Sequence, residues 1–262
     1  MIFFPNAKIN SDLNIVSKRQ DGYHNLETLF YPIDWKDVLE IIPAKQFNFS
    51  STGVDISGSQ NSCEKAYYLL KKDFDISAVH IHLHKNIPTG AGLGGGSSDA
   101  STTLMALNKL FDLQLPKTKL MEYALKCGAD CPFFIHNTPS LASGVGEVLS
   151  PVKLNLRGYH LLVIYPSIFV STKVAFSKIV PSVPKNPIAR EIKKPVCDWQ
   201  LSNDFEQGVF EQFPEIAHIK QQLIDAGAVF SSLSGSGSSV FALFNEKPTI
   251  EFNDHRMFYQ FL

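Results

Sequence analysis

The pattern of apolar and polar residues predicts that the first third of the chain consists mainly of β-strands. Residues 79–84 alternate strictly between an apolar side chain and histidine, which is the pattern of a strand that buries one face. Residues 63–72 carry apolar side chains at helical spacing, so one helix is expected among the strands. Shorter apolar runs bounded by turn residues are also expected to be strands, at residues 12–16, 38–42 and 47–49.

The apolar spacing becomes helical in the middle of the chain. The leucines of residues 99–111 fall on one side of a predicted helix and indicate a buried stripe. A second helix is expected to begin at a cap formed by Thr118 and to end at Gly128.

Strands return in the last part of the chain. Residues 159–165 form an apolar run, and residues 239–244 are predicted to be the final strand of the core. Between them, a helix is predicted over residues 214–226, ended by Gly227. The proline-rich segment 181–195 is expected to be a surface connection.

Length and charge limit the classes of protein to which the chain can belong. Its 262 residues fit one large domain or two modest ones, and we place a boundary so that the domains are residues 1–148 and 149–262. The 24 Lys and Arg against 25 Asp and Glu give a net charge of −1, so neither nucleic acid nor an anionic membrane surface is an expected partner.

No part of the sequence indicates export. No apolar stretch approaches the length of a membrane span, and residues 1–5 lack the basic flank and apolar core of a signal peptide. We therefore expect a cytoplasmic globular protein, a monomer or a homodimer, whose four cysteines are free thiols. Cys127 and Cys131 are expected to be buried.

A glycine-rich segment carries the clearest chemical signal. Five glycines lie within residues 90–96, between the predicted strand 79–84 and the predicted helix 99–111. Glycine admits positive φ angles and lets a ligand approach the backbone, and the free N–H groups of a first helical turn favour an anion such as phosphate. Ser97 and Ser98 follow, and either hydroxyl could cap the helix or contact a phosphate or its Mg²⁺.

Other interpretations of this segment fit less well. A Walker A loop requires Gly-Lys-Ser/Thr at its end, whereas Gly95 is followed by Gly96. The spacing Gly90-x-Gly92-x-x-Gly95 satisfies the Rossmann fingerprint, but a second helix, not a strand, follows the first. A flexible linker is disfavoured because regular elements flank the run on both sides. A phosphate cradle is the preferred interpretation.

Four motifs in order resemble the GHMP kinases. The central motif is Pro88-x-Gly90-Ala91-Gly92-Leu93-Gly94-x-x-Ser97-Ser98. Residues 7–10 and 21–24 resemble the substrate segments of the branch of this family that acts on 4-diphosphocytidyl-2-C-methyl-D-erythritol, and residues 128–134 resemble its catalytic aspartate segment. Residues 234–238 resemble the third motif, a glycine turn expected to close behind the phosphate loop.

The resemblance implies a fold and an activity. The fold would be α+β with two domains, ribosomal-protein-S5-like and then ferredoxin-like, and with the active site between them. The protein would be an ATP- and Mg²⁺-dependent kinase for the 2-hydroxyl of 4-diphosphocytidyl-2-C-methyl-D-erythritol in the non-mevalonate route to isoprenoids. Its partner would thus be a small molecule, and no side chain is assigned as a metal ligand.

Residue roles also follow from the resemblance. Lys8 and Asp130 would flank the reacting hydroxyl, with Thr172 nearby. The remaining assignments concern binding. On the alcohol substrate, Asn10 would contact the methylerythritol part, Tyr23 and Phe176 would sandwich the cytosine, and His24 would hydrogen-bond to its edge. On ATP, Asn61 would lie near the adenine. The nucleotide phosphates would be held by Pro88, Gly90, Ala91, Gly92, Leu93, Gly94, Gly95, Gly96, Ser97 and Ser98.

The chemistry of these residue types fits phosphoryl transfer. A carboxylate can accept the proton of an attacking alcohol, and an ammonium can neutralise charge on the phosphoryl oxygens. Taken singly, each has a structural alternative: Asp130 as a helix cap, Lys8 as a solvated charge, Tyr23-His24 as a turn and Phe176 as core. Whether Asp130 is a base or an orienting anion stays open.

Three features depart from the pattern or compete with it. Ser11-Asp12 replaces the apolar residues usual after Asn10, and the added carboxylate is able to pair with Lys8 or to raise the desolvation cost of the site. The apolar residues usual after Asn61 are missing as well. His80, His82 and His84 share a strand face, for which a polar exposed face is a better explanation than a metal site.

Three rival functions fit the sequence less well. A GHMP kinase for a base-free alcohol would leave Tyr23, His24 and Phe176 without a ring to bind. An inactive family member serving as a sensor would be expected to lose Lys8 or Asp130, and both are present. A Rossmann dehydrogenase is disfavoured by topology.

Overall fold

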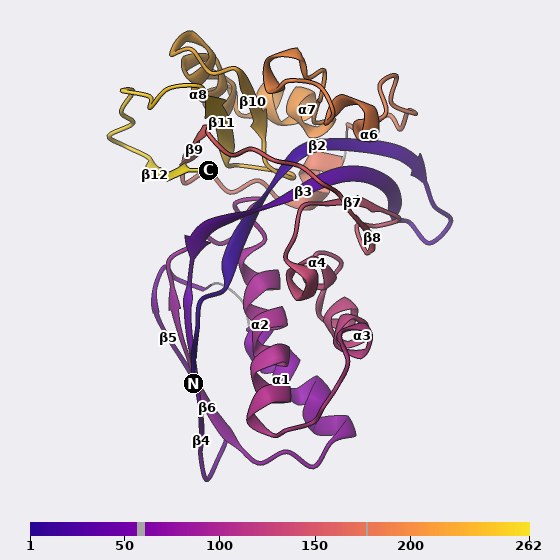
Figure 1. The fold of residues 1–262 in the computed structure, drawn as a ribbon, viewed down its shortest axis with the longest axis vertical. Coiled ribbons are helices and arrows are strands. Elements are labelled where there is room, and N and C mark those ends of the chain that lie inside the picture. Colours follow the sequence, from indigo (N-terminus) through magenta and orange to yellow (C-terminus); the bar gives the residue numbers. More distant parts are fainter. Residues whose placement is uncertain (57–60, 177) are drawn as a thin grey trace. The chain divides into compact units, whose positions relative to one another are not determined.

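The computed structural model describes residues 1–56, 61–176 and 178–262 and divides into two compact units (Figure 1). The units are interleaved along the chain. Unit 1 comprises residues 1–8, 34–89 and 94–138, and unit 2 comprises residues 9–33, 90–93 and 139–262. The predicted boundary at 148/149 would cut the chain at a single point, whereas each of these units is made of several separate segments. The predicted domain boundary therefore stays a prediction.

Unit 1 contains a four-stranded sheet covered by helices. The strand order is β1 (Ile2–Phe3), β4 (Val38–Pro43), β6 (Val79–Lys85) and β5 (Asn48–Gly53), in which only the β5–β6 pair is parallel. Val79, Ile81 and Leu83 of β6 pack in the core with side chains from the helices. These helices are α1 (Ser62–Asp73), α2 (Gly95–Leu110), α3 (Lys117–Cys127) and α4 (Cys131–His136).

Most predicted elements of unit 1 are present, with two corrections at helix starts. The helix predicted over 99–111 begins earlier, at Gly95, so the last glycines of the run already have helical backbone. Thr118 is not the cap of α3, because that helix begins at Lys117 with Pro116 at the N-cap position and no side-chain capping bond. The fixed φ of proline favours a helix start without such a bond.

Unit 2 contains an antiparallel sheet of four strands. Their order is β10 (Phe230–Leu233), β11 (Val240–Phe244), β9 (His160–Tyr165) and β12 (Arg256–Phe261). The helices α7 (Phe205–Gln212) and α8 (Pro214–Asp225) contribute Phe205, Val209, Ile216, Ile219 and Leu223 to the core of this unit.

One prediction for unit 2 was wrong. Residues 239–244 are not the final strand, because β12 follows and pairs with β9. Its residues alternate in burial, but Met257, Tyr259 and Phe261 occupy the exposed positions, so no apolar–polar alternation marks the strand. Most of the segment 181–195 is exposed or half-buried, as expected of a surface connection, and it also contains the short helix α6 (Ile188–Glu191).

A third sheet consists of β2 (Asn6–Lys18), β3 (His24–Lys36), β7 (Ser140–Ser143) and β8 (Val148–Pro151) in that order. The strand predicted at residues 12–16 is therefore the second half of a longer one. Residues 7–15 of β2 are all buried, so the side chains of Lys8, Asn10 and Asp12 are enclosed. Among the described residues, no helix is long and apolar enough to cross a membrane.

Candidate active site

The second half of the glycine run lies in unit 1, at the start of α2. Gly94 is the N-cap residue, with φ of 69°, and its lack of a side chain leaves the first turn of α2 without a side-chain cap. A Cβ at Gly94 would lie 2.9 Å from Cζ of Phe134 and 3.1 Å from Cε of Lys8. The backbone therefore packs directly on Lys8, and the N–H groups of the first turn form a cradle suited to an anion.

Lys8 and Asp130 form an ion pair beside this helix start. The distance from Lys8 Nζ to Asp130 Oδ2 is 3.6 Å, and the side chains are 3% and 35% exposed. Burial lowers the pKa of Lys8, and the charge of Asp130 and its hydrogen bond oppose that shift. Lys8 is thus not a solvated surface charge. Asp130 stands at the N-cap position of α4, but its side chain makes no capping bond there.

The first half of the glycine run lies in unit 2, against the third predicted motif. A Cβ at Gly92, where φ is 77°, would lie 1.9 Å from the carbonyl oxygen of Ser234. The Ser234 hydroxyl donates to the Gly92 carbonyl at 3.0 Å, and the Ser239 amide donates to the Ala91 carbonyl at 3.2 Å. The glycine turn of residues 234–238 lies against the loop, as the resemblance implies.

The other predicted nucleotide residues anchor the loop or the helices. Pro88, Ala91 and Leu93 are buried, and Ser98 is 1% exposed, whereas Gly96 is exposed. The side chains of these four buried residues are thus set into the protein, and the part they play in binding phosphate stays a prediction.

Asn61 is the N-cap residue of α1. Its side-chain oxygen accepts from the Cys63 amide at 2.8 Å, and its own amide donates to Glu64 at 3.0 Å, which makes a reciprocal capping box. The predicted contact of Asn61 with adenine stays a prediction, because residues 57–60 before it lie outside the described part of the chain.

The predicted substrate residues lie in unit 2. The rings of His24 and Phe176 stack at a centroid distance of 4.9 Å and an angle of 22°. Tyr23 is 66% exposed, and Thr172 is exposed at the start of the short helix α5 (Thr172–Phe176). Of the two rings predicted to sandwich a cytosine, Tyr23 and Phe176, the second is stacked on His24. The sandwich itself stays a prediction.

Asn10 and the unexpected Asp12 are both buried in β2. The Asn10 side chain donates to the Thr28 hydroxyl at 2.8 Å. An Asp12 carboxylate oxygen accepts from the Ser202 amide at 3.1 Å, whereas Lys8 pairs with Asp130. Burial raises the pKa of Asp12 to about 7, and the hydrogen bond from Ser202 opposes that shift.

The three histidines of β6 bond to hydroxyls of β5. His80 and His82 lie 2.9 and 2.8 Å from the Ser50 hydroxyl, and His84 lies 2.9 Å from that of Thr52. Polar pairs between neighbouring strands therefore explain why three histidines lie on one face of β6. All four cysteines are free, and Cys131 is buried as expected, whereas Cys127 is only half-buried.

Sequence reasoning missed a buried ion cluster next to the helix start of α2, formed by Asp37, Lys85 and Asp99. One signal was available, because the alternation of residues 79–84 continues to Lys85 and places this lysine on the buried face of β6.

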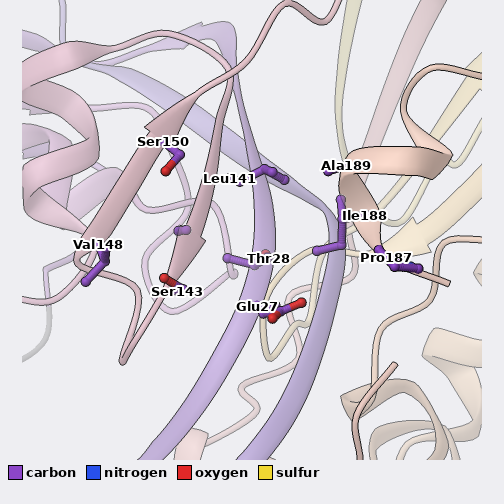
Figure 2. A pocket seen from close by; sticks show the side chains of 10 residues that line it. Glu27, Thr28, Leu141, Ser143, Val148, Ser150, Pro187, Ile188 and Ala189 are labelled. Atoms are coloured by element: carbon purple, nitrogen blue, oxygen red, sulfur yellow. The ribbon is translucent and has the colours of Figure 1, made fainter. Parts of the chain in front are cut away.

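A separate cavity of about 290 Å³ lies within unit 2 (Figure 2). It is bounded by strands β3, β7 and β8 and by the start of α6, and Figure 2 shows Glu27 and Ile188 at its wall. Its lining residues are Glu27, Thr28, Leu141, Ala142, Ser143, Val148, Ser150, Pro187, Ile188 and Ala189.

Comparison with known families places the chain in a class. Residues 61–138 match the N-terminal domain of GHMP kinases, and residues 189–252 match the GHMP kinase C-terminal domain. The chain belongs to the GHMP kinase family, has its two-domain fold of helices and sheets, and is an ATP-dependent small-molecule kinase. The predicted family, fold class and enzyme class are confirmed.

Relatives of high identity share one name. The 4-diphosphocytidyl-2-C-methyl-D-erythritol kinase of Bacteroides thetaiotaomicron is 51% identical over 262 residues, covering 97% of this chain and 96% of the relative. That of Cytophaga hutchinsonii is 50% identical over 253 residues, covering 95% and 94%.

Solved structures agree with this relationship. A crystal structure of 4-(cytidine 5'-diphospho)-2C-methyl-D-erythritol kinase aligns with a TM-score of 0.80 at 32% identity, covering 93% of this chain and 90% of the other. The mevalonate kinase of Methanococcus jannaschii aligns with a TM-score of 0.68 at 15% identity over 99% and 97% of the two chains, which is a likeness of fold alone.

Proposed function

We propose that this chain transfers the γ-phosphoryl group of ATP to the 2-hydroxyl of 4-diphosphocytidyl-2-C-methyl-D-erythritol, in the non-mevalonate route to isoprenoids. The observation that carries the reaction is the enclosed Lys8 ammonium, 3.6 Å from the accessible Asp130 carboxylate and packed against Gly94 at the start of α2. The substrate assignment rests on near-full-length relatives of that name at about half identity.

Asp130 and Lys8 have complementary roles in this proposal. The Asp130 carboxylate, which is partly open to solvent, accepts the proton of the hydroxyl as its oxygen attacks phosphorus. The Lys8 ammonium holds that carboxylate in place and stabilises negative charge that develops on the phosphoryl oxygens. The uncapped first turn of α2 adds backbone N–H groups to the same stabilisation.

Mg²⁺ and the phosphates of ATP fit the side chains near this helix start. Mg²⁺ usually keeps several waters and binds through one or two protein oxygens together with substrate phosphates. Ser97, in the first turn of α2, is the oxygen donor that would complete such a shell. When bound, the Mg²⁺–ATP complex supplies the phosphoryl group and neutralises part of its charge.

The proposal also assigns the recognition of the alcohol. Tyr23 and Phe176 would contact the cytosine, with His24 at its edge, and Asn10 and Thr172 would contact the methylerythritol part. The support is that the His24 and Phe176 rings stack on each other and that the Tyr23 ring is exposed and therefore accessible to a ligand. A cytoplasmic location belongs to the same proposal and is supported by four free thiols.

A coupled assay of ADP release tests the function. We expect turnover with 4-diphosphocytidyl-2-C-methyl-D-erythritol and none with homoserine, mevalonate or galactose, because the last three offer no base to the aromatic residues. Equal turnover of any base-free alcohol would remove the substrate assignment.

The variant Asp130→Asn tests the catalytic pair. Loss of the proton acceptor is expected to lower kcat by about 10²- to 10⁴-fold, with nucleotide affinity retained. Stopped-flow measurement of the chemical step and a direct nucleotide-binding titration separate the two quantities. A near-normal kcat for this variant would show that the carboxylate does not take part in the reaction.

A further inference from the structure

A buried cluster of three charged side chains lies beneath the start of α2. Lys85, the last residue of β6, donates from Nζ to Asp37 Oδ2 and, at 2.8 Å, to Asp99 Oδ2. The side chains of Lys85, Asp37 and Asp99 are 2%, 0% and 3% exposed. The cluster joins three places in unit 1: the end of β6, the residue before β4 and the second turn of α2.

The cluster fixes the chain on the N-terminal side of the glycine run. The other oxygen of Asp37, Oδ1, accepts from the amides of Asn86 and Ile87 at 2.6 and 2.8 Å. These are the first two residues after β6, so Asp37 sets the direction in which the backbone leaves the sheet toward the run.

The same cluster fixes the chain on the C-terminal side of the run. A Cβ at Gly95 would lie 2.8 Å from Nζ of Lys85 and 2.9 Å from Cγ2 of Ile87, so the first residue of α2 packs directly on both. Asp99, four residues later, receives the Lys85 hydrogen bond. One ammonium therefore holds both the segment that enters the glycine run and the helix that leaves it.

The chemistry of the cluster favours a geometric role over phosphate contact. One ammonium is shared by two carboxylates, so the cluster brings no net positive charge to an anion. Burying three charged groups is costly compared with apolar packing, and among the described residues Asp99 Oδ1 has no hydrogen-bond partner. Apolar packing would stabilise the fold at least as well as such a cluster. The cluster is better suited to fixing the direction of two backbone segments.

We propose that Asp37, Lys85 and Asp99 are positioning residues of the kinase, which hold the two sides of the glycine run so that the first-turn N–H groups of α2 face the nucleotide phosphates. They act through the backbone of residues 86–87 and 95 and do not touch the nucleotide. This inference rests on the proposed binding of ATP at the start of α2.

The titratable groups around Asp99 are consistent with this arrangement. Lys85 from β6, Asp37 before β4 and Cys63 from α1 interact electrostatically with it. Burial raises the pKa of Asp99 to about 7, and the Lys85 ammonium opposes that shift. Burial also raises the pKa of the Cys63 thiol, which therefore stays neutral.

Two substitutions at one position test the proposal. Asp99→Asn keeps an oxygen that accepts from Lys85, whereas Asp99→Leu has a similar volume and no acceptor. Both leave Lys85 paired with Asp37, so both variants are expected to fold. Affinity is measured by titration with a fluorescent N-methylanthraniloyl derivative of ATP, without the alcohol substrate, and stability is measured by thermal unfolding.

We expect Asp99→Asn to bind the ATP derivative within about twofold of the wild type. Asp99→Leu should bind at least about fivefold more weakly while its unfolding temperature is equal or higher, since an apolar residue replaces a buried charge. Equal affinity of the two variants would overturn the proposal. A fall in affinity that only follows a fall in stability would overturn it as well.

A control variant and the wild type separate this inference from the proposed function. Glu191→Gln alters another buried carboxylate, which pairs with Lys194 in unit 2, and should leave nucleotide affinity unchanged. If the wild type binds the ATP derivative but does not turn over 4-diphosphocytidyl-2-C-methyl-D-erythritol, the function fails and the comparison at Asp99 still decides the inference. A wild type that binds no nucleotide overturns both.

Discussion

Lys8 and Asp12 lie four residues apart on β2, and both are almost completely enclosed. Their described partners differ, because Lys8 pairs with a carboxylate from the start of α4 and Asp12 accepts from a backbone amide. Burial favours the neutral form of either side chain, and a nearby opposite charge offsets this penalty on the charged form more than a neutral hydrogen-bond donor does. The two residues therefore respond to pH in different ways.

The carboxyl of Asp12 should make folding stability depend on pH. Its pKa is about 7 in the folded protein and about 3.9 in an unfolded chain, so the folded protein retains a proton that the unfolded chain loses. The associated stability is fully present below pH ~4 and is lost as the pH rises through ~7. From pH 5 to pH 8 we expect the wild type to lose more stability than Asp12→Asn, by on the order of a few kcal/mol.

Urea unfolding at pH 5, 6, 7 and 8 measures this difference. Asp99 is present in both proteins, so its own titration cancels in the comparison. The surface variant Asp34→Asn, whose carboxylate is 65% exposed, serves as the control and should follow the wild type. Parallel pH profiles for the wild type and Asp12→Asn would contradict the expected titration.

At the scale of the element, the glycines of the glycine run, residues 90–96, are present for different reasons. Gly92 has φ of 77°, and a Cβ there would lie 1.9 Å from a backbone oxygen, so no side chain fits. Gly96 lies inside α2, and the nearest described atom to an added Cβ would be the Ser62 hydroxyl at 3.4 Å. Packing therefore requires the first glycine but not the second.

The substitution Gly92→Ala is expected to destabilise the protein by at least about 2 kcal/mol, from the left-handed backbone together with the clash. Gly96→Ala should be neutral or stabilise by up to about 1 kcal/mol, as alanine is favoured over glycine in a helix. Chemical denaturation of the two variants gives the comparison. Equal stability would mean that the loop relaxes around the added methyl group.

Elements with a strong local pattern were predicted well, and elements defined by distant partners were not. The helix at residues 63–72 and the strand at 79–84 appear as α1 and β6 because their apolar period is set by one buried face. β12 was missed because its pairing with β9 defines it, and the early start of α2 was missed because Gly95 packs on Lys85.

The candidate site shows the same limit. Motif resemblance identified Lys8 and Asp130, and the structure places them 3.6 Å apart. No sequence pattern indicated that His24 would stack on Phe176, or that Asp37 and Asp99 would share one ammonium. These contacts join residues that are far apart along the chain, and their geometry arises only when the sheets and helices are assembled.

At the scale of the whole molecule, the interleaving of the two units determines what can fold alone. The core of unit 2 includes Leu13 and Ile15, which belong to β2 near the start of the chain. A fragment comprising residues 149–262 lacks these two side chains and the rest of β2 and β3. Its core would be open where the strands are missing.

We therefore expect the fragment 149–262, expressed alone, to show no cooperative thermal transition, in contrast to the full chain. Circular dichroism during heating distinguishes the two cases. Addition of a second fragment, residues 1–148, should restore a transition because it returns β2 and β3. Cooperative unfolding of the isolated fragment would show that the C-terminal part is an autonomous folding domain.

The unequal enclosure of Lys8 and Asp130 makes their pair reactive from one side only. With 3% of the lysine side chain and 35% of the aspartate side chain open to water, a dissolved carbodiimide can reach the acid, whereas an amine-directed reagent cannot readily reach the ammonium. A covalent inhibitor of this enzyme should therefore direct its reactive group to the Asp130 carboxylate. The buried Lys8 ammonium would contribute only electrostatic attraction to a negatively charged part of the inhibitor.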